Sequence, residues 1–176
     1  MQVRVLITCA LLLATAIQAP DAKTTLGTAQ LRNGEGEMVG LATFSEGDDG
    51  VTIIVHFYNM PPGVHALHIH AAGSCESPGF KTAKGHFNPF GREHGMKNPE
   101  GAHAGDLPNI TVGQDGTGAA VVKAPLVTLG EGKNSLFRDG GTALMVHQGP
   151  DDYATDPAGA AGPRIACGII ELFVAE

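Results

Sequence analysis

Histidine is the residue type in this chain whose number and spacing point to chemistry. Six of the eight histidines fall in one segment, from residue 65 to residue 106, which ends in an aspartate. The residues concerned are His65, His68, His70, His86, His94, His103 and Asp106. Imidazole and carboxylate groups bind transition metals in proteins. We therefore expect this segment, joined by His147 and Cys167 from further along the chain, to form a metal site.

One part of the set suits zinc. Separations of 8, 9 and 3 residues divide His86, His94, His103 and Asp106. A loop with this spacing can fold around one ion, and three imidazoles with one carboxylate suit a tetrahedral zinc site.

A further three histidines, His68, His70 and His147, lie outside such a zinc site and can form a second group. The motif His68-Ile69-His70 lies on an expected strand, where alternate side chains point to the same face. Sites rich in imidazole suit copper. Because each imidazole has two nitrogens, one shared histidine would give two metals four ligands each from seven residues.

The elements that must position these residues are expected to be strands. With 25 Gly and 11 Pro, the composition favours short strands and turns over helices. Alternating or β-branched runs predict strands at residues 24–32, 38–44, 51–58, 64–70, 109–112, 118–123, 143–147 and 165–174. The turn Gln114-Asp115-Gly116 predicts that the fifth and sixth of these form a hairpin. Two long loops, residues 71–105 and 148–163, interrupt the pattern, which indicates an antiparallel sandwich or barrel.

The first residues have the pattern of a signal peptide. Arg4 precedes a short apolar run, and Ala14-Thr15-Ala16 fits a cleavage site, with cleavage after Ala19 as an alternative. We expect residues 1–16 to be removed and residues 17–176 to form one domain. The apolar run is too short for a stable membrane anchor. The net charge of -7 and the lack of any basic run exclude a nucleic-acid partner.

Removal of the first residues would leave two cysteines, Cys75 and Cys167. In an exported chain, two cysteines most simply form one disulfide. They are 92 positions apart (167 − 75). Closing so long a loop stabilises the folded state by at most roughly 4–5 kcal/mol in the chain-entropy description.

These motifs together resemble the copper/zinc superoxide dismutases, and particularly the bacterial periplasmic branch. They run in order along nearly the whole of the expected mature chain. The carriers are His65-Ala66-Leu67-His68-Ile69-His70, the run from Gly85 to Gly95, the run from His103 to Asn109, Met145-Val146-His147, and the run from Gly162 to Gly168. The resemblance implies an all-β fold, an eight-stranded antiparallel Greek-key β-barrel or flattened sandwich whose two long loops form the metal site.

The resemblance also implies a role for each site residue. Copper would be bound by His68, His70, His86 and His147. Zinc would be bound by His86, His94, His103 and Asp106, so that His86 bridges the two metals. Around them, Asp151 would link His68 to His94, His65 would be a supporting histidine, Arg164 would flank the copper and attract the substrate anion, and a Cys75–Cys167 disulfide would tie the loop to the last strand.

The implied activity is the disproportionation of superoxide to dioxygen and hydrogen peroxide. Copper would cycle between Cu(II) and Cu(I), His86 would carry a proton, and zinc would take no part in electron transfer. The implied location is the periplasm, and bacterial relatives include both monomers and homodimers.

The charge of the second long loop does not favour attraction of an anion. It has no lysine but carries Asp151, Asp152 and Asp156. We hypothesise that Lys81 and Lys84 in the first loop attract the anion instead. An ordinary solvated role for the two lysines is the competing interpretation.

Two other functions compete with the enzyme. An exported copper/zinc-binding protein without turnover is expected to lack a ligand or the arginine, but all seven ligands and Arg164 are present. A β domain stapled by zinc alone leaves His68, His70 and His147 unexplained.

Overall fold

The computed structural model describes residues 26–173. The predicted signal segment, residues 1–16, lies outside the described residues. Ten strands are present: β1 (Leu26–Asn33), β2 (Met38–Gly47), β3 (Gly50–Phe57), β4 (Gly63–His65), β5 (Leu67–His70), β6 (Ile110–Val112), β7 (Gly118–Ala124), β8 (Ala143–His147), β9 (Arg164–Ile169) and β10 (Glu171–Phe173). A single 3-10 turn, η1 (Lys81–Ala83), is the only helical element in this range.

The strands form one long curled sheet and one short one. The long sheet has the order β5-β8-β9-β1-β2-β3-β7, with β10 paired to β1, and the short sheet pairs β4 with β6. Every pairing is antiparallel. Since β4 leads into β5 and β6 leads into β7, the short sheet connects the two ends of the long one. The expected all-β antiparallel fold is thus confirmed.

The core follows from the alternation of side chains along the strands. In β3, Val51, Ile53, Val55 and Phe57 are buried, while Ile54 and His56 between them are exposed. Strands β5 and β8 differ, because every residue in them is buried. One face of these two strands packs Leu67, Ile69, Leu144 and Val146 into the core. The other face carries histidines, so it must be covered by loops.

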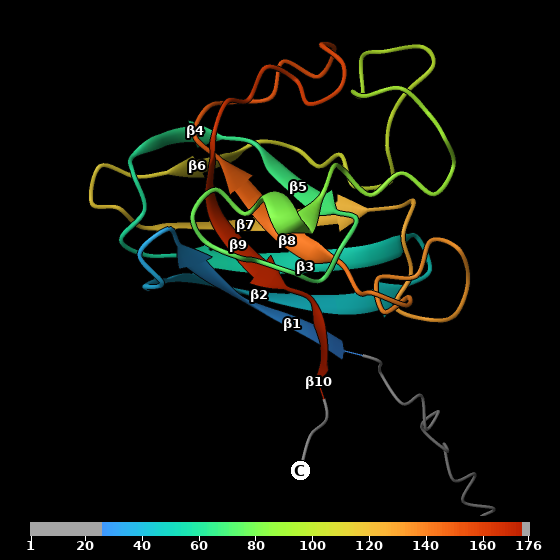
Figure 1. Ribbon diagram of the computed structural model, residues 1–176, viewed down its shortest axis with the longest axis horizontal. Coiled ribbons are helices and arrows are strands. Elements are labelled where there is room, and N and C mark those ends of the chain that lie inside the picture. The colour runs from blue at the N-terminus through green and yellow to red at the C-terminus, as the bar shows by residue number, and fades with distance from the viewer. Residues whose placement is uncertain (1–25, 174–176) are drawn as a thin grey trace, which may run out of the picture.

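Both long loops rise from the same side of the sheet (Figure 1). The first is tied down by a Cys75–Cys167 disulfide with an S–S distance of 2.01 Å, which confirms the predicted pairing. Phe80 and Ala83 of the same loop pack with Ala143, Met145 and Cys167 in a second small core. No helix within residues 26–173 is long and apolar enough to cross a membrane.

Three strand predictions were wrong in detail. The run 64–70 is two strands, β4 and β5, and at the break between them the Ala66 N–H donates to Gly149 O while its carbonyl accepts the His147 N–H. Residues 109–112 and 118–123 do not pair as a hairpin, since β6 pairs with β4 and β7 with β3. The run 165–174 is divided into β9 and β10, where the Ile170 N–H donates to Thr142 O.

Candidate metal centre

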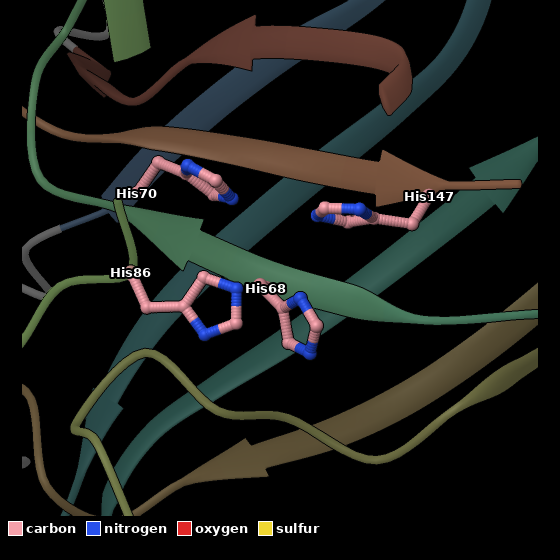
Figure 2. Close-up of side chains that lie close together, drawn as sticks. All are labelled: His68, His70, His86 and His147. Carbon is pink, nitrogen blue, oxygen red and sulfur yellow. The ribbon is translucent and has the colours of Figure 1, made fainter. Parts of the chain in front are cut away.

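Strands β5 and β8 bring three histidines together on the outer face of the sheet. The two strands pair with His68 opposite Met145 and His70 opposite Ala143. The His147 ring then lies 5.1 Å from the His68 ring and 5.7 Å from the His70 ring, centroid to centroid. His86 completes the group from the first loop, with its ring centroid 4.0 Å from that of His68. Figure 2 shows the four rings gathered over β5 and β8.

One nitrogen on each of these four rings is buried and has no hydrogen-bond partner within residues 26–173. These atoms are His68 Nδ1, His70 Nε2, His86 Nε2 and His147 Nε2. The four side chains offer ligand atoms that all lie within 4.8 Å of one another. A buried polar atom without a partner is costly, and a metal ion between the rings would supply the missing partner. The donor set is therefore suited to copper.

The second nitrogen on each strand-borne ring fixes where its proton lies. His70 Nδ1 donates to Lys84 O at 2.8 Å, and His147 Nδ1 donates to Gly162 O at 3.0 Å. His68 Nε2 donates to Asp151 Oδ2 at 2.9 Å. Each ring thus keeps its N–H on the outer side and turns a lone pair towards the centre, as metal-binding histidines do.

The loop-borne half of the site converges on one carboxylate oxygen. Asp106 Oδ1 lies 2.8 Å from His86 Nδ1, 3.0 Å from His94 Nδ1 and 3.2 Å from His103 Nδ1. The other oxygen, Asp106 Oδ2, accepts the backbone N–H groups of Gly95 and His103 at 2.8 and 3.0 Å. Three imidazole nitrogens and one carboxylate oxygen within 4.8 Å of one another fit a tetrahedral zinc site.

His86 belongs to both groups. Its Nε2 is among the unpartnered nitrogens of the first group, and its Nδ1 contacts Asp106 in the second. Asp151 makes a second link between the halves, because Oδ2 accepts from His68 and Oδ1 accepts from His94 Nε2 at 3.0 Å. The two groups are therefore joined by one ring and by one carboxylate.

Burial sets the charge of the four histidines that gather over β5 and β8. It lowers the pKa of His68, lowers the pKa of His70 to about 2, and lowers the pKa values of His86 and His147 to about 4. These rings are neutral at neutral pH, which is the form that binds a cation.

The loop-borne half has the opposite tendency. Burial opposes ionisation of Asp106, but hydrogen bonds with His103, His86 and His94 outweigh it and hold the pKa well below its usual range. Burial likewise opposes a charge on His94, but Asp106 and Asp151 raise its pKa to about 9. A metal ion that binds here must displace a proton from His94.

Arg164 reaches from β9 to the edge of the first group of histidines, here called the copper-type group. Its members are His68, His70, His86 and His147. Its Nη1 and Nη2 donate to Phe80 O at 2.7 Å and to Lys84 O at 2.6 Å. Lys84 O is also the acceptor for His70, so the guanidinium and this histidine share one carbonyl. Lys81 and Lys84 are exposed, at the start and just beyond the end of η1.

His65 lies outside both groups. Its two ring nitrogens lie 3.0 Å from His147 O and 2.8 Å from Pro61 O. The ring therefore supports the end of β8.

The acids of the second loop have local partners. Asp156 Oδ1 accepts the N–H of His94 at 2.8 Å, and Asp152 accepts the N–H groups of Ala154 and Thr155. Sequence reasoning treated these acids only as charges. It also missed the carbonyls of Lys84 and Gly162, which no side-chain motif can reveal, and the amide of Asn109, which pairs with the backbone of Asp151.

Comparison with known proteins agrees with this geometry. A family profile described as copper/zinc superoxide dismutase matches residues 38–170. The chain is 52% identical to superoxide dismutase [Cu-Zn] 2 of Aquifex aeolicus over 162 residues, which cover 91% of this chain and 93% of that protein. It is 39% identical to superoxide dismutase [Cu-Zn] of Caulobacter vibrioides over 82% of this chain and 84% of that one.

Solved structures give the same result. Cu/Zn superoxide dismutase from Brucella abortus matches with a TM-score of 0.66 and 31% identity, over 83% of this chain and 99% of that one. A SOD-like protein from Bacillus subtilis matches with a TM-score of 0.78 and 42% identity, over 81% and 96%. The chain belongs to the copper/zinc superoxide dismutase family and is an oxidoreductase that acts on superoxide, with copper and zinc as its cofactors.

Proposed function

We propose that the superoxide dismutase activity is carried by the two side-chain groups described above. Copper is bound by His68, His70, His86 and His147. Zinc is bound by His86, His94, His103 and Asp106. The observation that carries the assignment is the His86 ring, which turns Nε2 to one group and Nδ1 to the other.

A bound copper ion supplies a one-electron couple, which takes an electron from one superoxide to release dioxygen and gives it to a second to form peroxide. Hydrogen peroxide also needs two protons, of which the chain holds one and solvent supplies the other. His86 Nε2, whose ring is held through Nδ1, is the atom that we assign to hold and deliver one proton. The Arg164 guanidinium, fixed by two carbonyls, places a positive charge beside the copper ligands and attracts the anion.

A superoxide-consumption assay with a matched ligand variant tests the assignment. The protein loaded with copper and zinc should consume superoxide, and His147→Ala should lose the activity while it keeps zinc. An exported copper/zinc-binding protein without turnover is the competing function. Stoichiometric binding of both metals with no superoxide consumption would favour that alternative and overturn the proposal.

We also propose that Lys81 and Lys84 attract the substrate. The carbonyl of Lys84 is bound by both His70 and Arg164, which places this exposed lysine next to the copper group. Attraction between exposed charges weakens as salt increases. In Lys81→Ala/Lys84→Ala, kcat/KM should therefore fall less steeply with ionic strength than in the unmodified protein.

A control variant, Lys123→Ala/Lys133→Ala, removes the same charge from other loops and strands. It should leave the slope of kcat/KM against ionic strength unchanged. Equal slopes in the unmodified protein and in the Lys81→Ala/Lys84→Ala variant would rule out the steering role.

We infer that residues 1–16 direct export to the periplasm and that residues 17–176 form the mature single domain. The inference rests on Arg4, the apolar run and the small residues at 14–16. The disulfide and the bacterial relatives support it, because disulfides persist in oxidising compartments. N-terminal sequencing of the protein from a periplasmic fraction should start at residue 17. An intact N-terminus on cytoplasmic protein would contradict the inference.

A further inference from the structure

The carboxylate of Asp151 needs an external support. It links His68 to His94, and its residue is buried. Its loop, residues 148–163, contains no strand or helix. A carboxylate that must meet two rings at once tolerates little movement, so the backbone of Asp151 has to be held by another part of the chain.

The side-chain amide of Asn109 provides this support. Its Nδ2 donates to Asp151 O at 2.9 Å, and its Oδ1 accepts the Asp151 N–H at 2.8 Å. The amide thus pairs with both backbone groups of one residue, in the way that a neighbouring strand would. Two bonds to a single residue fix its orientation as well as its position.

Tyr153 closes the arrangement. Its N–H donates to Asp151 Oδ1 at 2.6 Å, and its phenol oxygen accepts the Asn109 N–H at 2.8 Å. The carboxylate, the backbone of its own residue and the amide are thereby connected in one network.

The origin of Asn109 explains why the network can align two sites. Asn109 lies three residues after Asp106 and directly before β6, which pairs with β4. Strand β4 in turn leads into β5, which carries His68 and His70. This network of Asn109, Asp151 and Tyr153, here called the clamp, therefore joins the second loop to the segment that connects the zinc-type ligands with β6. Strand β6 leads through β4 to the strands of the copper-type group.

A glycine also lies against the carboxylate. A Cβ on Gly159 would overlap Asp151 Oδ1 and lie 2.8 Å from His94 Nε2. Gly159 is buried, so the bond between Asp151 and His94 is covered by backbone alone. Asn109 thus holds the backbone of Asp151, and the Gly159 backbone limits where its carboxylate can lie.

We propose that Asn109 is a positioning residue that holds the Asp151 carboxylate against His68 and His94, and so sets the affinity of the zinc site. The proposal rests on the zinc ligand set proposed above. Partners that orient metal-binding histidines typically contribute about 10–100-fold to metal affinity. Asn109 acts one step further out, so its effect should lie at the lower end of that range. Asn109 is also the first residue of Asn-Ile-Thr, the triplet pattern of N-glycosylation sites. In the structure, however, its Nδ2 donates a hydrogen bond to Asp151 O.

Zinc affinity measured by chelator competition on the disulfide-bonded protein tests the proposal. Asn109→Ala should weaken zinc binding by roughly tenfold. Asn109→Asp keeps the oxygen that accepts the Asp151 N–H but sets a second oxygen, which cannot donate, against Asp151 O, so it should also weaken zinc binding. The matched control is Asn134→Ala, because Asn134 is also partly buried and also donates its Nδ2 to a loop carbonyl, Leu126 O.

A double-variant cycle distinguishes positioning from general weakening of the fold. If Asn109 acts through Asp151, then Asn109→Ala should cost nothing further in an Asp151→Ala background. In the zinc-loaded, copper-free protein, the exchangeable ring N–H signals of His68 and His94 should broaden in Asn109→Ala and stay sharp in Asn134→Ala.

Three results would overturn the proposal. They are unchanged zinc affinity in both Asn109 variants, an equal loss in the Asn134 control, and fully additive losses in the double variant. Failure of the unmodified protein to bind zinc would instead contradict the zinc ligand set itself, so the two proposals can fail separately.

Discussion

The two halves of the metal centre are built in different ways. The copper-type half stands on paired strands, where His68, His70 and His147 share a face because of the β5–β8 register. The zinc-type half stands on a loop, where His94 and His103 belong to no strand. It is held by the hydrogen bonds of Asp106 and Asp151, and its ends at Phe87 and Gly105 are hydrogen-bonded through the backbone to Ile69 of β5.

The difference separates two sources of precision. In the strand-borne half, backbone pairing fixes the ligands before any metal arrives. In the loop-borne half, carboxylates and close backbone contacts fix the ligands. The carboxylates also carry negative charge, which a bound metal ion must balance. We therefore expect the loop-borne half to depend far more on single polar residues than the strand-borne half does.

The disulfide should show the largest effect on stability. Cys75→Ala/Cys167→Ala opens a loop of 92 residues and should lower the free energy of unfolding by up to roughly 4–5 kcal/mol. Chemical denaturation measures the loss. Because the bond anchors the first loop, whose Phe80 and Lys84 carbonyls hold the Arg164 guanidinium, activity should fall more than zinc affinity. A variant that lost zinc affinity first would contradict the division into two halves.

Removal of Asp106 should have the next largest effect. Asp106→Ala takes away a proposed ligand and the acceptor of two backbone N–H groups, and it leaves buried imidazoles unpaired. Breaking such a buried network typically costs about 3–5 kcal/mol. Amide hydrogen exchange should show faster exchange in residues 86–106 and at the Ile69 N–H of β5, which donates to Gly105 O, and unchanged exchange in β8. Equal loosening of the strands would show that the halves are not independent.

Gly159→Ala should weaken the link between the halves. The new methyl group meets the Asp151 carboxylate, and overpacking of this kind costs about 1–3 kcal/mol. Gly162→Ala is a matched control, because Gly162 has a similar positive φ of 76° but no neighbour within 4 Å of its Cβ position. Zinc competition should show weaker binding in Gly159→Ala than in Gly162→Ala. Equal zinc affinity in the two variants would mean that backbone strain at a positive φ, and not contact with the Asp151 carboxylate, weakens zinc binding.

The smallest effect is expected from Tyr153→Phe. It removes one hydrogen bond, from the Asn109 N–H to the phenol oxygen, and such bonds contribute about 0.5–1.5 kcal/mol. Thermal unfolding and zinc competition should both shift slightly and in the same direction. A loss as large as that of Asp106→Ala would place Tyr153, rather than Asn109, at the centre of the clamp.

The sequence predicts the strand-borne half better than the loop-borne half for the same physical reason. Side chains alternate between the two faces of a strand, so the sequence alone assigns His68 and His70 to one face. The zinc-type ligands could be counted but not arranged, since their geometry depends on carboxylates that meet them from distant segments. Asp151 entered only through the resemblance to a family.

Errors in the predicted strands have a similar cause. The hairpin at residues 109–123 was predicted from a local turn, but β6 found its partner in β4, which is distant in sequence. The break at Ala66 depends on backbone hydrogen bonds to Gly149 and His147. Backbone hydrogen bonds of this kind cannot be predicted from a pattern of side chains.

Anomalous scattering at the copper and zinc absorption edges, from crystals of the protein loaded with Cu(II) and zinc, tests the shared histidine most directly. We predict one copper bound by His68 Nδ1, His70 Nε2, His86 Nε2 and His147 Nε2. We predict one zinc bound by the Nδ1 atoms of His86, His94 and His103 and by Asp106, with Zn–N distances of about 2.0–2.1 Å. A map with one metal per chain, or with His86 bound to only one of two metals, would contradict the account.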